Sequence, residues 1–144
     1  MKELLRIVCP QCNTINHVPA ARLTDGPKCG QCHERLFTGH PIALTAADFD
    51  LHATRKDIPL VVDFWAPWCG PCQMMTPAYE QAAKVLEPRL RLAKVNTEEE
   101  QALAARFGIQ SIPTLMLLRE GREMARQSGA LGAQDIVQWV RAHV

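Results

Sequence analysis

The chain has 144 residues, of which 47% are hydrophobic and 22% charged, and its formal net charge is +1. This size and composition predict one globular domain, or a domain with a small appendage, and exclude gross disorder. The near balance of charge favours neither a nucleic-acid nor a membrane-surface partner, and the longest apolar runs are far shorter than a membrane span. Glu3 and Arg6 interrupt the apolar core that a signal peptide needs, so we expect a cytoplasmic protein.

Six cysteines form three C-x-x-C pairs. We interpret them as metal-binding or redox-active, because cytosolic reductants would keep a disulfide framework open. Two pairs lie in residues 1–40, where large apolar side chains are few and prolines and glycines are frequent. From Ile42 onward, apolar runs alternate with helical periodicities. We therefore place a domain boundary near Gly39-His40-Pro41, between residues 1–40 and residues 41–144.

The first two pairs, Cys9-x-x-Cys12 and Cys29-x-x-Cys32, are separated by sixteen residues, which is typical of zinc sites. Each pair forms a tight turn that aims two thiolates at one point, and two such turns complete a tetrahedral four-sulfur site. Four protein ligands leave no open position, so we expect one structural Zn²⁺ per chain in a zinc-ribbon-like module, which also explains how so short a segment folds. The alternative is four reduced or adventitiously oxidised thiols.

Zinc ribbons often bind nucleic acid, and the charge of this module tests that use. Residues 1–40 carry five basic and three acidic side chains, and four thiolates with one Zn²⁺ contribute two negative charges, so the module is near neutral. Without a basic face or an aromatic stacking platform, we expect no nucleic-acid partner. His17 and His33 are expected at the surface, because four cysteines already fill the metal shell.

The second part is predicted to be an α/β domain in which strands and helices alternate. Apolar or alternating runs predict four strands, at 60–65, 90–95, 114–118 and 123–128. Capping boxes and helical periodicity predict four helices, a short one opened by Thr45-x-x-Asp48, then 74–86, 97–107 and 134–143. The third helix is expected to be capped by Thr97-x-x-Glu100, and Pro77 to kink the second. This alternation, with its terminal hairpin, implies a mixed sheet covered by helices.

The third pair, Cys69-x-x-Cys72, follows the predicted strand at 60–65 and stands at the start of a helix. Unpaired backbone N–H groups and the positive end of the helix dipole favour the thiolate form of Cys69, and only the thiolate attacks disulfides. Cys72 lies one helical turn further inward. We expect it to be shielded until Cys69 has formed a mixed disulfide, and then to resolve that disulfide.

Asp63 interrupts the apolar strand between Val62 and Phe64. Burial raises the pKa of a carboxyl group, and such a group can accept the proton of Cys72. From its position alone, an ordinary polar strand residue that faces a helix cap or water is an equally good interpretation.

The motif Trp68-Cys69-Gly70-Pro71-Cys72, with Asp63-Phe64-Trp65-Ala66 before it and Ile112-Pro113-Thr114 after it, resembles the active site of the thioredoxin family. The resemblance covers about residues 41–144. Together with the amino-terminal cysteine pairs, the whole chain resembles the zinc-containing thioredoxins of the thioredoxin 2 type. It implies a thioredoxin fold, with a central mixed sheet and helices on both faces, and a redox-active disulfide at a helix N-terminus.

The resemblance also assigns site residues. It implies a cis peptide bond between Ile112 and Pro113, a buried carboxylate at Asp63 supported by Lys94, and a substrate groove beside the dithiol. By themselves, Lys94 and Gly129 would be interpreted as a solvated strand residue and a turn. The groove is expected to contain Trp68, Gly70, Pro71, Ile112, Pro113 and Gly129.

We expect the protein to reduce disulfides in oxidised client proteins. No G-x-G-x-x-G follows a strand, so we expect no bound organic cofactor, and the resemblance implies NADPH-linked thioredoxin reductase as the electron source. The Gly70-Pro71 dipeptide resembles that of reducing members of the family, which predicts a potential near the roughly −270 mV of thioredoxin. One departure is Gln73, where many members carry a Lys or Arg. It removes a positive charge next to the dithiol.

Two other functions compete with the reductase. In the first, the chain is a redox-regulated zinc-binding module or holdase-like adaptor, and its second domain is a recognition platform. Replacement of Cys69 by Ser separates the two, since a pure binding function would survive it. The second, an oxidative folding catalyst, requires an export signal that the sequence does not show.

Overall fold

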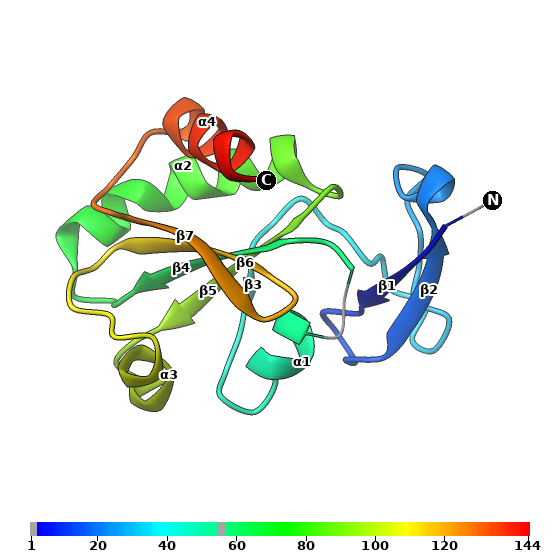
Figure 1. Cartoon of the computed structure of the whole chain (residues 1–144), viewed down its shortest axis with the longest axis horizontal. Coiled ribbons are helices and arrows are strands. Elements are labelled where there is room, and N and C mark those ends of the chain that lie inside the picture. Colours follow the sequence, from blue (N-terminus) through cyan, green and yellow to red (C-terminus); the bar gives the residue numbers. More distant parts are fainter. Residues whose placement is uncertain (1–2, 55–56) are drawn as a thin grey trace.

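A computed structural model describes residues 3–54 and 57–144 and arranges them as a small amino-terminal module beside a five-stranded sheet with helices on both faces (Figure 1). The module contains an antiparallel hairpin of β1 (Leu4–Val8) and β2 (Ile15–Pro19), followed by a 3₁₀ turn at Ala20–Arg22. This hairpin was not predicted from the sequence. It holds the first cysteine pair in the loop between its two strands.

The sheet has the strand order β3-β5-β4-β6-β7. The first three strands in this order are mutually parallel, and β6 and β7 each run antiparallel to their neighbour, which confirms the predicted mixed sheet. The strands are β3 (Ile42–Ala43), β4 (Leu60–Trp65), β5 (Arg91–Asn96), β6 (Thr114–Arg119) and β7 (Arg122–Ser128).

Four α-helices cover the two faces of the sheet in the described part of the chain (Figure 1). Their bounds are α1 (Phe49–Thr54), α2 (Gly70–Leu86), α3 (Gln101–Arg106) and α4 (Ala133–His143). Because side chains alternate along a strand, β4 sends Val61 into the cluster with α2 and α4, and Val62 and Phe64 into the cluster with α1 and α3. None of these helices is long and apolar enough to cross a membrane.

Two helices begin several residues away from their predicted starts. Helix α2 starts at Gly70 rather than 74, since Pro71 is compatible with the first helical turn, and it continues through Pro77. The predicted capping box at Thr97 is wrong. The Thr97 hydroxyl donates instead to the carbonyl of Trp65 at 3.0 Å, and α3 starts at Gln101 without a side-chain cap. Before α1, Asp48 accepts the backbone N–H of Thr45 at 2.8 Å, as a capping box requires.

The amino-terminal module packs against the end of the sheet where β4 and β5 begin (Figure 1). The side chain of Ile58, just before β4, belongs to the small core of the module. The guanidinium of Arg6 pairs with Asp57 at 2.8 Å, and the backbone N–H of Asp57 donates to the Arg6 carbonyl at 2.9 Å. Cys69 follows the other end of β4. The two cysteine centres therefore lie at opposite ends of the same strand.

Candidate active site and metal centre

The third cysteine pair lies where β4 leads into α2. Cys69 is the N-cap of α2 and Cys72 lies in its first turn, and the two are joined by a disulfide with a Cα–Cα distance of 5.2 Å. The backbone N–H of Cys72 points at Sγ of Cys69, 3.2 Å away. The helix thus directs an otherwise unsatisfied backbone donor at this sulfur, which is the arrangement that stabilises a thiolate.

The residues next to the disulfide in the chain are largely exposed and mostly apolar, and Trp68, Gly70, Pro71 and Met74 are called the rim below. Cys69 and Cys72 are 4% and 2% exposed, so exposure in the oxidised form does not separate their roles, whereas Trp68 is 69% exposed and Met74 79%. Gly70 and Pro71, between the cysteines, are also exposed. Direct access to the sulfurs therefore requires a partner that seats itself closely on this rim.

A second segment faces the disulfide from the loop before β6. The carbonyl oxygen of Ile112 lies 3.8 Å from Sγ of Cys69, and the Ile112–Pro113 peptide bond is cis, as the resemblance implies. The backbone N–H of Gly129 donates to the Pro113 carbonyl at 2.9 Å, and its φ of +96° is the left-handed conformation that favours glycine. The structure thus places Ile112 beside Cys69, with Pro113 next to it and Gly129 bonded to Pro113.

Asp63 lies on the same face of β4 as Val61, and this face packs against α2. Its side chain is 1% exposed, and Oδ1 has no hydrogen-bond partner among the described residues. Burial raises the pKa of Asp63 to about 7, and the positive charge of Lys94 opposes that rise. A carboxyl group with this pKa exchanges a proton near neutral pH.

Lys94 is the register partner of Asp63 on the adjacent strand β5. It is half-buried, and its ammonium nitrogen lies 4.5 Å from the centroid of the Trp65 ring. The charge of this ammonium group acts on the buried carboxyl group of Asp63, so Lys94 is more than a solvated strand residue.

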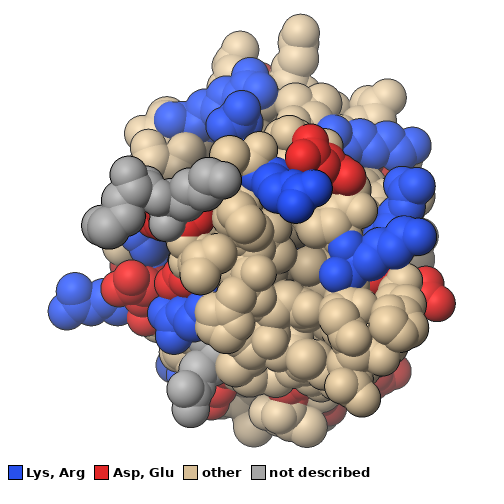
Figure 2. All heavy atoms as spheres, turned by 90° about the vertical axis from the view of Figure 1, so that its right-hand side faces the viewer, with Lys and Arg blue, Asp and Glu red and all other residues tan. Residues whose placement is uncertain are grey.

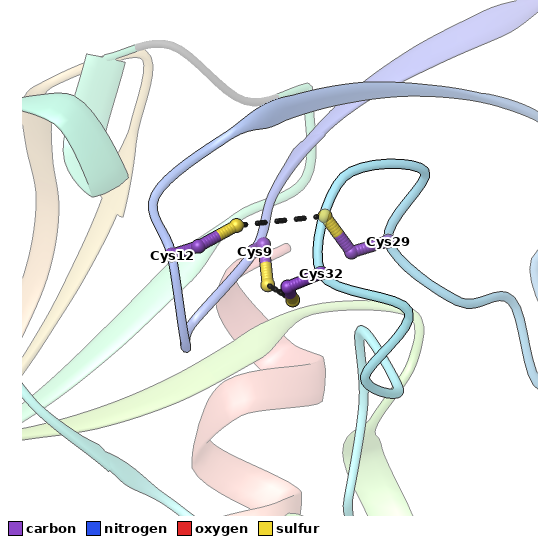
Figure 3. Close-up of side chains that lie close together, drawn as sticks. All are labelled: Cys9, Cys12, Cys29 and Cys32. Atoms are coloured by element: carbon purple, nitrogen blue, oxygen red, sulfur yellow. Dashed lines mark hydrogen bonds between the residues drawn. The ribbon is translucent and has the colours of Figure 1, made fainter.

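The other four cysteines converge in the amino-terminal module (Figure 3). Their sulfur atoms all lie within 4.8 Å of one another, and the pairs Cys9–Cys32 and Cys12–Cys29 are each 3.6 Å apart. A tetrahedral Zn²⁺ with bonds of 2.3 Å places its sulfurs about 3.8 Å apart. The cluster fits this ion in donor type, number and spacing.

Two equivalent backbone turns build this cluster. In each, the N–H two residues after the first cysteine points at its sulfur, from Gln11 to Cys9 and from Gln31 to Cys29, both at 3.4 Å. The residue after the second cysteine adopts a left-handed conformation, with φ of 63° at Asn13 and 65° at His33. His33 is exposed, as is His17, and neither belongs to the cluster.

Asn16 on β2 is a supporting residue that the sequence analysis missed. Its amide nitrogen lies 3.5 Å from Sγ of Cys29, and its amide oxygen accepts the N–H of Gly30 at 2.9 Å. Neighbouring backbone N–H groups, that of Cys32 first, and this amide lower the pKa of Cys29 to about 6. No spacing rule identifies Asn16, because only the hairpin brings it to the second cysteine turn.

Comparisons with known proteins match both parts of the chain. The Thioredoxin family model matches residues 40–142, and the model described as "Thioredoxin 2, N-terminal", a zinc ribbon, matches residues 8–34. "Thioredoxin C-3" of Corynebacterium nephridii is 43% identical over 134 residues, which cover 93% of this chain and 92% of that protein. "Thioredoxin" of Haemophilus influenzae is 40% identical over 98 residues, 68% of this chain and 92% of its own length. "Thioredoxin" of Pseudomonas aeruginosa is 34% identical over 105 residues, which cover 73% of this chain and 97% of that protein.

Proposed function

Because the chain belongs to the thioredoxin family, and is thus a protein-disulfide oxidoreductase, we propose that Cys69 and Cys72 form the dithiol with which it reduces client disulfides. The observation that carries this proposal is the disulfide between the N-cap and the first turn of α2, within reach of an apolar rim.

In the first step, the thiolate of Cys69 attacks one sulfur of the client disulfide. A bond forms between Sγ of Cys69 and that sulfur, the client S–S bond breaks, and the second client sulfur leaves as a thiolate. The backbone N–H of Cys72, 3.2 Å from Sγ of Cys69, stabilises the attacking thiolate.

In the second step, Cys72 loses its proton and attacks Sγ of Cys69, which breaks the mixed disulfide and releases the second client thiolate. Two electrons have then passed from the dithiol to the client. We propose Asp63 as the acceptor of the Cys72 proton, because it is buried on the face of β4 beneath α2 and its pKa of about 7 matches the pH of this reaction. Lys94 positions the carboxylate charge from the adjacent strand.

The client is proposed to bind in an extended conformation. On one side it would contact Trp68, Gly70 and Pro71, and on the other side the two loops that contain Ile112 and Gly129. Backbone groups of Ile112 would bond the client main chain, and the exposed ring of Trp68 would cover its side chains. Such a surface recognises main chain and general apolarity, so client choice should be broad.

The oxidised protein has to be reduced again by a partner. Family membership supports an NADPH-linked thioredoxin reductase as this partner and the cytoplasm as the compartment, and we propose both. The test uses purified protein with that reductase and an oxidised client. Cys69→Ser should abolish client reduction, and Cys72→Ser should accumulate client-linked mixed disulfides. Full activity of Cys69→Ser would instead favour a binding or holdase-like function.

Residues 1–40 are proposed to form a zinc-ribbon module that holds one Zn²⁺ through Cys9, Cys12, Cys29 and Cys32. When bound, the ion would link two backbone turns that have little apolar core of their own, which is a structural role. Metal analysis of the purified protein tests the ion and its stoichiometry. Removal of residues 1–40 tests the boundary: we expect reductase activity to remain, since both reactive thiols and the two large cores lie outside the module.

A further inference from the structure

A buried arginine links the sheet to the metal module. Arg91 is the first residue of β5 and is 1% exposed, the largest side chain among those that are almost fully buried. A buried guanidinium is costly unless other groups compensate its charge. The groups that surround Arg91 therefore have to compensate its buried charge.

Two of its contacts belong to the amino-terminal module. Nη2 of Arg91 donates to the backbone carbonyl of Val8 at 3.3 Å, and Val8 directly precedes the metal ligand Cys9. The guanidinium carbon also lies 4.4 Å from the centroid of the Phe37 ring. Nε has no hydrogen-bond partner among the described residues. The side chain thus reaches out of the sheet and ends against the first cysteine turn.

The metal centre explains this placement. Four thiolates around one Zn²⁺ carry a net charge of −2, and Cys9 and Cys29 are buried. The lysines and arginines seen on this end of the molecule lie at its surface (Figure 2), where water screens them. Arg91 is buried with the cluster. Burial lowers the pKa of its guanidinium, and the negative charges of Glu87 and then of Cys9 oppose that fall.

We propose that Arg91 is the buried counter-charge of the zinc-tetrathiolate centre, and that through it the thioredoxin sheet helps to retain the metal. Arg91 is a positioning residue here, since it touches the backbone next to a ligand and not the ion itself. This inference rests on the zinc centre proposed above.

A second anion near Arg91 provides the competing explanation. The carboxylate of Glu87 lies 4.0 Å from Nη1, and it also accepts the backbone N–H groups of Gly39 and Leu92, each at 3.3 Å. If Arg91 served only to neutralise Glu87, then removing both charges together would leave zinc retention unchanged.

The experiment measures the rate of zinc transfer from the full chain to a chromogenic chelator. Arg91→Met alone would leave the Glu87 carboxylate without its guanidinium and can fail to fold. The decisive variant is therefore Glu87→Gln/Arg91→Met, in which both charges are absent and a hydrophobic side chain fills the space. Glu87→Gln alone is one control, and Arg89→Met, an exposed arginine two residues away, is the other. Tryptophan fluorescence verifies that the thioredoxin domain of each variant is folded, since all three tryptophans lie in that domain.

We expect the double variant to release zinc about 10–100-fold faster than the wild type, the range typical of lost outer-shell partners, and both controls to stay within about threefold of it. Equal rates of zinc release for Glu87→Gln and the double variant would overturn the proposal and show that Arg91 serves only to neutralise Glu87. Wild-type protein that binds no metal would overturn the zinc centre itself.

Discussion

The two kinds of C-x-x-C pair in this chain share a spacing and differ in backbone. In the metal module, the N–H that points at the first sulfur comes from two residues further on, and the chain then turns through a left-handed residue. At the dithiol it comes from Cys72, three residues further on, and the chain continues as a helix. The first geometry leaves both sulfurs free to face another pair, whereas the second brings the two sulfurs to each other.

The surroundings complete this difference. The four cysteines of the amino-terminal module bring their sulfurs within 4.8 Å of one another, so one metal ion can bind all four thiolates. The dithiol lies at the end of β4, which carries the buried carboxyl group of Asp63, and next to the exposed apolar rim. One centre is thus built to hold its thiolates permanently, and the other to form and lose a thiolate in every cycle.

The largest expected effect separates the two centres directly. Cys69→Ser should lower client-disulfide turnover by at least about 10³-fold because the nucleophile is lost. Cys12→Ser should leave turnover within about threefold while it abolishes zinc retention. Parallel measurement of turnover and metal content checks both. Loss of turnover in Cys12→Ser at unchanged fluorescence would show that the two centres are not independent.

The second prediction concerns the proton of the resolving step. Asp63→Asn should slow the attack by Cys72 by about 10²-fold at neutral pH, the lower range for loss of a general base. In the wild type, the rate should rise with pH through about 7, where Asp63 ionises. Single-turnover kinetics from pH 6 to 9 measure this. An unchanged profile in Asp63→Asn would make the carboxyl purely structural.

The same residue predicts a change in stability. Its pKa is raised from 3.8 to about 7 in the folded protein, so folding binds a proton that the unfolded chain would release. The stability this gives is fully present below about pH 4 and is lost as the pH rises through about 7. Asp63→Asn should therefore be more stable than the wild type at pH 8, by up to about 4 kcal/mol, and show no such gain at pH 4. Urea unfolding at the two pH values tests the sign.

A smaller effect is expected at the client groove. Ile112→Asp places a charge beside Cys69 where a client must lie, and should lower turnover of protein disulfides by about tenfold. Reaction with a small soluble disulfide, which needs no groove, should change far less. Met124→Asp, which places the same charge at an exposed apolar side chain on β7, is the control. Equal losses for the two substrates would argue against this groove.

Sequence reasoning identified most of the second domain and both cysteine centres, because strands 60–65 and 114–118 are apolar except for Asp63 and Thr114 and the C-x-x-C pairs are local patterns. It failed where the burial or the hydrogen-bond partner of a residue depends on segments that are distant in the sequence. Arg91 alternates with apolar neighbours as an exposed strand residue would, yet the metal module buries it. Thr97 fits a capping box, yet the end of β4 provides a better acceptor.

The smallest expected effect concerns Gln73, whose amide donates to the carbonyl of Pro67 at 2.5 Å across the active-site loop. A lysine at this position would add a positive charge close to Cys69, favour the thiolate and so stabilise the reduced dithiol. Because the side chain is exposed, solvent screens most of this charge. We therefore expect Gln73→Lys to raise the reduction potential by only about 10–30 mV, which corresponds to a stabilisation of the dithiol by at most about 1.4 kcal/mol. Equilibration with a glutathione redox buffer measures it.

Gln73→Met is the matched control, since it removes the hydrogen bond to Pro67 and adds no charge. If the two variants shift the potential equally, the loop hydrogen bond rather than the charge sets it. If only Gln73→Lys shifts it upward, the neutral side chain keeps this dithiol more reducing than it would be with a basic neighbour. A downward shift in Gln73→Lys would contradict the electrostatic argument, because a nearby cation cannot disfavour the thiolate form.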